Sequence, residues 1–467
     1  MSALSSLNTA RQAMAAQQRA LDVTAQNVAN LNTEGYSRQR VDLQSVSSNA
    51  VPAFFSTSTE ISGGVSADTV TRVRDAFMEN RALGEHASSA RLTVENDAYT
   101  QIEASFREPG ETGLQAITDT MWHSFEDVTG SDDAARSTVL QNIASVASSL
   151  NTTSSALDQQ WTQTREDLAA TLTQANATAD QIGSLNKQIQ QATQAGLSAN
   201  ELADKRDGLV LALADSIGAT SSVGSDGMVN VLVGGSSLVS GATATKLKLV
   251  GEASLDEFSA PGSQGLAVQT DPGGTKVAVG GASGGRLTVL TSTIPTYQAK
   301  LDGIATQIAD ALNGGNTSGY LSDGSPGSAL LGASDGSATI SARNISLLSS
   351  SPTVLAVSSM AGVASTDTSN AKAMAKLGVS SGVSADYRTL VTQLGVASAV
   401  SAQSLQIQTT ITGNIDTARE SVSGVSIDEE MTQMLTFQHG YQAAARMVTA
   451  MDEVLDKLIN GTGRVGL

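Results

Sequence analysis

The longest helical pattern in this 467-residue chain lies in a stretch without proline, between Pro109 and Pro261. Within it, apolar or small residues recur at steps of mostly three and four, which is the spacing of one face of a helix. The face comprises Leu140, Ile143, Ala147, Leu150, Ser154, Leu157, Trp161, Thr164, Leu168, Leu172, Ala175, Ala179, Ile182, Leu185 and Ile189. Because a helix rises about 1.5 Å per residue, this face predicts a rod about 80 Å long and hence an elongated molecule. Asp132 and Asp133 favour the start of this helix, and Gly196 is suited to cap its end.

The first thirty residues carry a second helical seam. Leu7, Met14, Leu21 and Val28 stand seven residues apart, which is the repeat of a coiled coil. An ordinary surface helix that docks on a core is an equally good interpretation of this spacing alone.

Two further helical faces occupy the C-terminal part of the chain. The first runs from Tyr387 to Val422, and the second begins near Ser426, which has capping-box spacing to Glu429. The second face includes Ile427, Met431, Met434, Tyr441, Val448, Leu455 and Ile459. Such a face needs partners, so we expect this helix to pair with the N-terminal one. In the assembled state, cysteines introduced near Leu21 and Val448 should crosslink.

Between these helices the composition changes. From about Ala219 to Leu290, short β-branched runs alternate with Asp-Gly and Gly-Gly turns, which predicts a small β module. Helical spacing returns over 291–313, and a Gly/Ser-rich stretch to about Ser369 predicts loop with a few strands. Near the N-terminus, the glycine pair within 51–73 predicts a short hairpin or an extended segment.

The predicted fold class is therefore mainly α with an inserted small β module. We expect an elongated molecule with its N- and C-terminal helices paired as a coiled coil, a long helical-bundle domain and an outer β domain. The expected segments are 1–41 (inner helical domain, N-terminal part), 42–217 (long helical domain, N-terminal part), 218–290 (β module), 291–370 (return helix and irregular segment), 371–424 (helical domain, C-terminal part) and 425–467 (inner helical domain, C-terminal part).

Charge and composition exclude several classes of protein. A formal net charge of -18 argues against a nucleic-acid binder and against binding to an anionic membrane surface. The absence of cysteine excludes disulfides, thiolate metal sites and cysteine nucleophiles. No apolar run approaches the length of a membrane span, and the N-terminus lacks the basic start and apolar core of a secretory signal.

Candidate catalytic groups are few. His86, His123 and His439 are the histidines, and none lies in an HExxH zinc motif or near a GxSxG nucleophile elbow. The Ser-Asp-Gly units at Ser322 and Ser334 lack the alternating ligands of a calcium loop and are interpreted as turns. We therefore expect no enzymatic activity, no catalytic residues, no cofactor and no metal.

The segment "NVANLNTEGYSRQRVDL", residues 27–43, ends the first helix in an unusual way. Asn30 and Asn32 can bond their own backbone, and Gly35 tolerates a positive φ. Tyr36 offers an apolar ring with a polar tip for a neighbouring surface, and Arg38 offers donors to carboxylates or carbonyls. An ordinary helix stop followed by a loop is the simpler interpretation.

This segment, together with "SVSGVSIDEEM" and "FQHGYQAAARMVTAMDEVLDKLI" near the C-terminus, resembles the axial proteins of the bacterial flagellum: rod, hook and hook-associated proteins. Within that group, "GYSRQ" and "ELADKRDGLVLALADSIG" are similar to the hook-associated protein 1 family of the hook-filament junction. Glu34 stands where many relatives have Pro or Ala, and the region from Gly218 to Asn370 is shorter than in larger relatives.

The resemblance implies a structural subunit of the flagellum that joins hook to filament. It implies assembly through the terminal helices, with Leu7, Met14, Leu21, Val28, Asn30, Gly35, Tyr36, Arg38, Ile427, Met431, Met434, Tyr441, Val448, Leu455 and Ile459 at the interface. The implied partners are further copies of this chain, the hook protein, the second hook-associated junction protein and a dedicated export chaperone on the C-terminal helix. It further implies an extracellular location on the flagellum and export through the flagellar type III pathway without a cleaved signal. From charge and apolar runs we expect neither nucleic-acid binding nor membrane insertion.

Three alternatives remain from the sequence. Another flagellar axial protein, such as the second junction protein, a hook protein or a flagellin, is the nearest. An extracellular enzyme is disfavoured because the sequence carries no recognised catalytic motif and no sizeable inserted domain. An extracellular coiled-coil adhesin would not need paired amphipathic helices at both ends.

Overall fold

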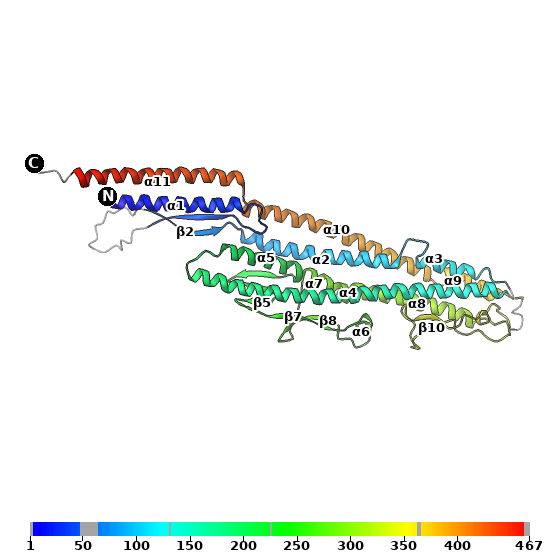
Figure 1. Cartoon of the computed structure of the whole chain (residues 1–467). Helices are drawn as coiled ribbons and strands as arrows, with labels where there is room; N and C mark the ends of the chain where they lie inside the picture. Colours follow the sequence, from blue (N-terminus) through cyan, green and yellow to red (C-terminus); the bar gives the residue numbers. More distant parts are fainter. Residues whose placement is uncertain (1–2, 47–63, 130–131, 225–226, 362–365, 462–467) are drawn as a thin grey trace, which may run out of the picture.

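The computed structural model describes residues 3–46, 64–129, 132–224, 227–361 and 366–461. The molecule is elongated, with α1 and α11 side by side at one end and the remaining elements in a longer body (Figure 1). This arrangement confirms the mainly helical, elongated fold class.

The helical elements have the following bounds: α1 Ala3–Ala29, α2 Ala76–Phe106, α3 Leu114–Ser124, α4 Asp133–Gln194, α5 Asn200–Ile217, α6 Leu255–Ser259, α7 Gly281–Thr288, a π-helical turn Val289–Thr293, α8 Ile294–Thr317, a 3-10 turn Pro352–Val354, α9 Ser369–Ser380, α10 Val383–Ser423 and α11 Ile427–Gly461. The strands are β1 Gln39–Ser45, β2 Val65–Arg72, β3 Thr220–Val223, β4 Val229–Val233, β5 Ser236–Ser240, β6 Thr243–Ala244, β7 Lys246–Gly251, β8 Leu266–Asp271, β9 Lys276–Val277, β10 Leu331–Ala333 and β11 Ile345–Leu347.

Helix α4 is the long rod that the sequence predicts. Its 62 residues correspond to about 93 Å of helix. The Asp132 carboxylate accepts hydrogen bonds from the backbone N–H groups of Ala134 and Ala135, at 2.9 and 3.2 Å, which caps the first turn. Gly196, with φ of 73°, follows its end. The predicted face is buried along the helix, with Leu157, Trp161 and Leu168 all at 0% exposure, so it forms the core of the body.

The strands of the β module, β3 to β9, lie beside α4, with β5, β7 and β8 along one side of it in Figure 1. They form a four-stranded sheet in the order β3-β4-β5-β6 and a three-stranded sheet in the order β7-β8-β9, with antiparallel neighbours throughout. Two asparagines of α4 hold them: Asn186 Nδ2 donates to the carbonyl of Val229 at 2.8 Å, and Asn176 Nδ2 donates to that of Leu247 at 2.8 Å. The β module is thus fastened to the helical rod by side chain to backbone bonds.

The end of the predicted β region is wrong, because residues 281–290 are helical. They form α7 and the start of the π-helical turn. A Cβ on Gly285 would lie 2.7 Å from the backbone oxygen of Arg91, and one on Gly284 would lie 2.7 Å from that of Val279. These glycines therefore permit close packing of α7 against α2 and against the segment that follows β9, and do not form turns.

The Gly/Ser-rich region contains the few strands that were expected. Strands β10 and β11 pair as an antiparallel ribbon. The Asp323 and Asp335 carboxylates each accept a hydrogen bond, both 2.9 Å, from the backbone N–H two residues later. Both Ser-Asp-Gly units are therefore turns, as predicted.

The segment after α1 is partly described. Residues 65–72 form β2, which pairs antiparallel with β1. An extended segment is therefore confirmed there, and its partner strand, Gln39–Ser45, was not predicted. The remainder of the predicted hairpin, residues 51–63, lies outside the described residues.

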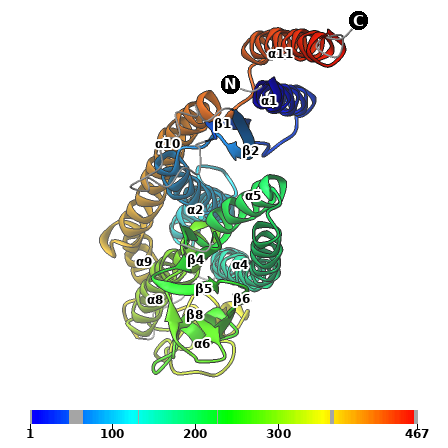
Figure 2. The ribbon, with the colours of Figure 1, turned by 90° about the vertical axis from the view of Figure 1, so that its left-hand side faces the viewer.

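Helices α2 and α10 pack along each other in the body, and α10 leads to α1 and α11, which we call the inner pair (Figure 2). Helices α1 and α11 then run antiparallel: Gln17 lies beside Gly440, and Asn27 Nδ2 donates to Glu430 at 3.0 Å. The predicted pairing of the two ends is confirmed. Within one chain this register separates Leu21 from Val448 by about twelve residues, or about 18 Å along the helices. The predicted crosslink between these two regions in the assembled state stays a prediction.

Candidate functional site

The candidate site is the joint between the inner pair and the body. It comprises the segment 30–38, which connects α1 to β1, and the break between α10 and α11 at Gly424–Ser426. Backbone and side-chain contacts hold these two segments against each other and against α5. We call this region the joint.

The end of α1 is fixed by local hydrogen bonds. Asn30 Nδ2 donates to the carbonyl of Gln26 at 3.0 Å, and Thr33 Oγ1 donates to Asn30 Oδ1 at 3.1 Å. Gly35 then has φ of 76°, a left-handed conformation that favours glycine. The predicted bond of Asn30 to the nearby backbone and the predicted positive φ of Gly35 are confirmed.

Asn27 is the centre of the joint. It is 1% exposed, and its Oδ1 accepts from the Tyr36 hydroxyl and from the Gln39 backbone N–H, both at 2.9 Å. Its Nδ2 donates to the Gln39 carbonyl at 2.9 Å and to Glu430 at 3.0 Å. Burial, with the nearby Asp204 and Glu430 carboxylates, raises the pKa of Tyr36 to about 12. The polar tip of Tyr36 is therefore used inside the chain.

Arg38 ties the N-terminal segment to the start of α11. Its backbone N–H donates to the Ser423 carbonyl at 2.9 Å, while Nε donates to Glu430 and Nη1 to Glu429, both at 2.7 Å. Glu430 is fully buried, so Arg38 supplies the charge that its carboxylate needs. The predicted binding of Arg38 to carboxylates is confirmed. Glu429 bonds to Arg38, and this contact, not the predicted capping box with Ser426, engages its carboxylate.

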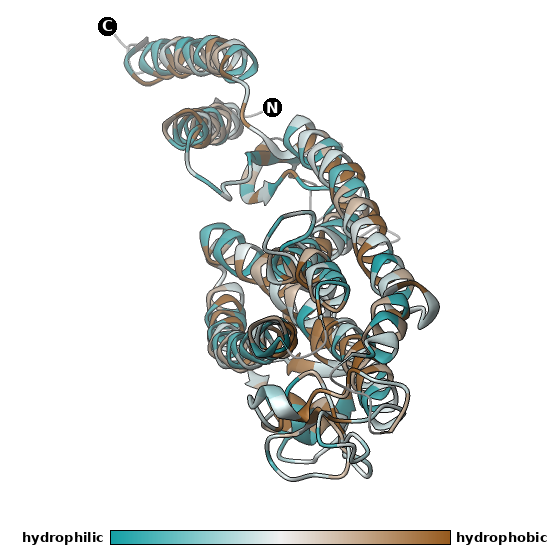
Figure 3. Cartoon of the chain, turned by 90° about the vertical axis from the view of Figure 1, so that its right-hand side faces the viewer, coloured by the Kyte–Doolittle hydropathy of each residue, from teal (hydrophilic) through white to brown (hydrophobic). Residues whose placement is uncertain are grey.

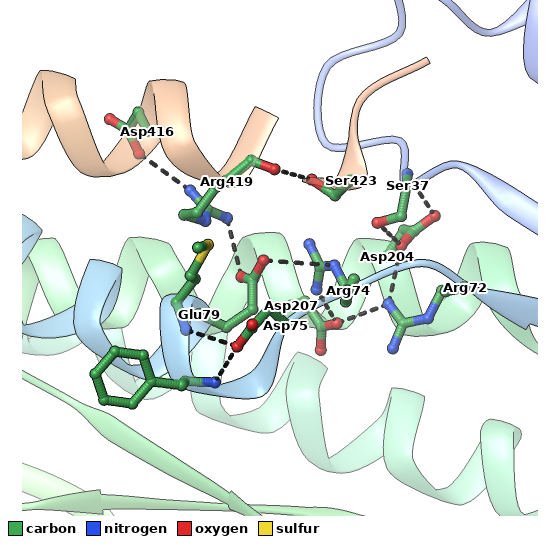
Figure 4. Close-up of polar contacts among 12 residues, drawn as sticks. Ser37, Arg72, Arg74, Asp75, Glu79, Asp204, Asp207, Asp416, Arg419 and Ser423 are labelled. Atoms are coloured by element: carbon green, nitrogen blue, oxygen red, sulfur yellow. Dashed lines mark hydrogen bonds and ion pairs between the residues drawn. The ribbon is translucent and has the colours of Figure 1, made fainter. Parts of the chain in front are cut away.

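A chain of alternating charges continues from the joint into the body (Figure 4). Ser37 Oγ donates to Asp204 at 2.8 Å, and Arg72 binds Asp204 at 2.9 Å and Asp207 at 2.7 Å. Arg74 also binds Asp207.

The chain then reaches α10. Arg74 lies 3.8 Å from Glu79, whose carboxylate binds Arg419 at 3.0 Å, and Arg419 binds Asp416 at 3.1 Å. These charges belong to β2, α2, α5 and α10 and, for Arg74, to the link between β2 and α2. The row of ion pairs therefore connects four elements below the inner pair. Because most of these groups are largely buried, solvent screens them less than it screens surface pairs.

A groove of about 1350 Å³ opens at the joint. Its walls come from the 30–38 segment, from α5 and from the α10–α11 break, and they include Leu31, Lys205 and Val425. Mixed polar and apolar walls of this size suit contact with another polypeptide. Among the described residues there is no group of His, Cys, Asp or Glu side chains that could hold a metal ion.

The predicted interface residues of the two terminal helices differ in exposure. On α1, Leu7, Met14, Leu21 and Val28 are half-buried, and the buried apolar residues are Ala10, Ala16, Ala20 and Val23. On α11, Met434, Tyr441, Val448 and Leu455 are half-buried, whereas Ile427, Met431 and Ile459 are 48%, 47% and 71% exposed. The structure therefore brings part of the predicted set together and leaves part of it open to solvent.

Sequence reasoning missed several residues of the joint. Asn27 and Glu430 bond to the joint from α1 and α11, Asp204 bonds to Ser37, and Arg72 and Asp207 continue the charge chain into the body; none of these five was predicted as a site residue. A signal existed for two of them: the "ADKRD" run places two aspartates three apart on one face of a helix.

No helix among the described residues is long and apolar enough to span a membrane. Comparison with known proteins identifies the families that parts of this chain match. Residues 99–331 match the family described as flagellar hook-associated protein FlgK helical domain. Residues 7–36 match the flagella basal body rod protein family, and 419–461 match the flagellar basal body rod FlgEFG protein C-terminal family.

Individual proteins that are similar to this chain bear names from the same family. Flagellar hook-associated protein 1 of Bacillus subtilis is 31% identical, over 98% of this chain and 98% of that protein. The protein of the same name from Salmonella typhimurium is 29% identical over 69% of this chain, and the match spans 58% of its length. The solved flagellar hook junction protein FlgK from Burkholderia pseudomallei superimposes with a TM-score of 0.64 at 18% identity, covering 74% of this chain and 100% of that chain, and it shows the same fold. The chain belongs to the flagellar hook-associated protein 1 family and is a structural component of the bacterial flagellum.

Proposed function

We propose that this chain is the subunit that joins hook to filament, and that it enters the junction layer through α1, α11 and the joint. Family membership supports the location, since the relatives carry the names hook-associated and hook junction protein. The exposed apolar flanks of α11 support the mode of assembly.

These flanks lie on both sides of the face that α1 covers. One flank carries Met431 and Leu435, at 47% and 55% exposure, and the other carries Met447, Val454 and Leu458, at 49%, 47% and 50%. Large apolar side chains in such rows gain stability when another molecule removes them from water. The colouring of Figure 3 shows apolar residues along both α1 and α11, at the end of the molecule that carries the two termini.

The partners follow from this mode of assembly. Copies of this chain would cover one another's flanks within the layer, and the hook protein and the second hook-associated junction protein would contact the layer on its two sides. A dedicated chaperone would cover α11 before export through the flagellar type III pathway, which leaves no processed N-terminus. The finished layer would lie outside the cell.

The test replaces one flank. We expect the double variant Met447→Gln with Leu458→Gln to be exported and to keep its helical content by circular dichroism. Cells that carry it should swim poorly and release unassembled flagellin, because the junction lacks apolar contacts. The matched control is Ala443→Gln with Ala450→Gln, two exposed positions on the side of α11 away from α1. Normal motility and no shed flagellin in the double flank variant would contradict the proposal.

A second measurement concerns order before assembly. The inner pair buries little apolar surface in one subunit, so residues up to about Val41 and beyond about Gly424 should be cleaved first by mild protease in dilute solution. Mass spectrometry of the fragments identifies the sites. Equal resistance of the inner pair and the body would show that the pair folds without neighbours.

A further inference from the structure

His86 lies where three helices of the body meet, just below the joint. It belongs to α2, and its side chain is 22% exposed. Its Nδ1 lies 3.3 Å from Asp215 of α5, and its Nε2 lies 3.1 and 3.2 Å from the two carboxylate oxygens of Asp416 of α10. One imidazole ring therefore faces a carboxylate at each nitrogen, on two different helices.

This geometry fits the doubly protonated ring. A neutral imidazole has a single N–H group and can donate to one of the two carboxylates, whereas an imidazolium donates to both. The hydrogen bond to Asp215 and the hydrogen bond to Asp416 raise the pKa of His86, against the opposing effect of partial burial.

The other charged groups around the ring are already engaged. On α10, Arg419 binds Asp416 at 3.1 Å and Glu79 at 3.0 Å. On α2, Glu85 accepts from Gln408 at 2.8 Å. Arg286 belongs to α7. Its neighbour Gly285 packs against Arg91, which lies more than one helical turn beyond His86 on α2. The two aspartates therefore set the charge that the ring meets.

The histidine is also connected to the joint. Asp416 is the last member of the charge chain that runs through Arg419 and Glu79 to Arg74 and, beyond it, to Ser37 (Figure 4). Seven residues after Asp416, the Ser423 carbonyl accepts the backbone N–H of Arg38. The position of the last turns of α10 therefore determines where the joint is held.

We propose that His86 is a proton-operated latch: its imidazolium clamps the end of α10 to α2 and α5, and its deprotonation loosens this clamp and the joint above it. The inference extends the proposed function, because it makes the rigidity of the junction subunit depend on pH. It concerns the free subunit and requires no assembly.

The sign follows from the raised pKa. A histidine whose pKa is higher in the folded than in the unfolded chain binds its proton more tightly when folded. The latch therefore contributes its full stability below the unfolded value of about 6.5, and this contribution is lost as pH rises through the higher folded value.

The first test is a titration of the full-length chain by NMR with labelled histidine, with the His86 signal identified by its loss in His86→Gln. We expect a midpoint above about 6.5 in the wild type and a lower midpoint in Asp416→Asn. Asp386→Asn, on the same helix but away from His86, is the control and should leave the midpoint unchanged. A wild-type midpoint at or below the reference value, or no change in Asp416→Asn, would overturn the proposal.

The second test measures how firmly the end of α10 is held. Deuterium exchange of residues 412–423 is compared between variant and wild type at the same pH, so that the intrinsic pH dependence of exchange cancels. For His86→Gln we expect exchange roughly two- to fivefold faster near pH 6, the range that a partly exposed ion pair supports, and a ratio near one at about pH 9. His123→Gln, an exposed histidine on α3, should give a ratio of one at both pH values. A ratio of one for His86→Gln near pH 6, or a ratio that does not change with pH, would refute the latch. Both readouts come from the free subunit, so they can fail while the motility test of the junction function succeeds, and the reverse.

Discussion

The body and the inner pair are both helical, but they bury their helices to very different degrees. Along α4, one face is closed from Val139 to Ile189 by helices and sheets, and many of its side chains are at 0 to 1% exposure. Along the described side chains of α11, Ala444 and Glu430 alone are buried, and seven larger apolar residues, among them Met431 and Ile459, are 47% to 71% exposed. The body therefore completes its core within one chain, whereas the inner pair has apolar surface left for other molecules.

Between them, the joint uses polar contacts where an apolar core is absent. Asn27, Arg38 and Glu430 satisfy one another, and Ser37 binds Asp204 of the body. Directional bonds of this kind specify an angle between two parts better than apolar packing does, because they fail when their geometry changes. The comparison predicts that mutations in the body reduce stability, that mutations on the inner pair reduce assembly, and that mutations in the joint alter the connection between them.

The largest effect on stability should come from the core of the body. Trp161 is fully buried, and its Nε1 donates to the Leu290 carbonyl at 3.0 Å. Trp161→Ala leaves a cavity and an unpaired carbonyl, so we expect a loss of about 3–5 kcal/mol in the free energy of unfolding. Urea denaturation followed by circular dichroism measures it.

The counterpart on the inner pair is Leu458→Ala. Leu458 is 50% exposed, so the same denaturation experiment should show a change within about 0.5 kcal/mol. If this variant destabilised the free subunit as much as Trp161→Ala does, the inner pair would be part of the same cooperative core and the contrast between the two regions would disappear.

The next effect should come from Arg38 in the joint. Arg38→Ala leaves the buried Glu430 carboxylate without its cation, so we expect a loss of about 2–3 kcal/mol in local stability. Deuterium exchange of residues 427–434 reports this loss. Arg40→Ala is the matched control, because the Arg40 side chain is 69% exposed and pairs with Asp42 at 3.3 Å. Equal exchange in the two variants would show that the arginine contacts do not hold the joint.

Particular elements show what could be predicted from the sequence. Helix α4 and the pairing of α1 with α11 follow from apolar periodicity, because burial of one face requires that spacing. Helix α7 could not be predicted in this way, because its glycines allow close contacts with α2, with α5 and with the segment after β9, and they look like turn residues in the sequence. The contacts of these glycines in the folded molecule, and not their local turn propensity, therefore determine that this segment is helical.

The joint was predictable only in part, because some of its residues act locally and others find their partners far away in the sequence. Asn30 and Gly35 act on the local backbone, and Arg38 carries a charge that needs a partner. Their residue types alone indicate these roles. Asn27 and Asp204 come together only after the chain has folded, since their partners are 403 and 167 residues away. Polar contacts between distant residues have no periodic signal in one sequence.

A smaller effect is expected at Gly35. Its φ of 76° is unfavourable for a β-branched residue, although a Cβ there would meet no atom within 4 Å. Gly35→Val should therefore cost about 1–2 kcal/mol through backbone strain alone. We expect nearly normal helical content with reduced motility and shed flagellin. Gly35→Asn is the control, because asparagine tolerates this conformation and should restore motility. Normal motility in Gly35→Val would mean that the segment is an ordinary helix stop.

The smallest effect should come from the Tyr36 hydroxyl, which donates to Asn27 Oδ1 at 2.9 Å. Tyr36→Phe keeps the ring and removes this one bond, so we expect a local loss of about 1 kcal/mol, seen as faster deuterium exchange at residues 36–39. The bond also has a pH signature. Because the pKa of Tyr36 is raised to about 12, the folded joint holds the phenolic proton more tightly than the unfolded chain does. Its contribution should be complete below the unfolded value of about 10 and should fall as pH rises from there toward 12. Tyr36→Phe should lack this fall, and Tyr320→Phe, in the Gly/Ser-rich region, should keep it. If the two variants responded alike at high pH, the hydroxyl of Tyr36 would have no part in holding α1 to the joint.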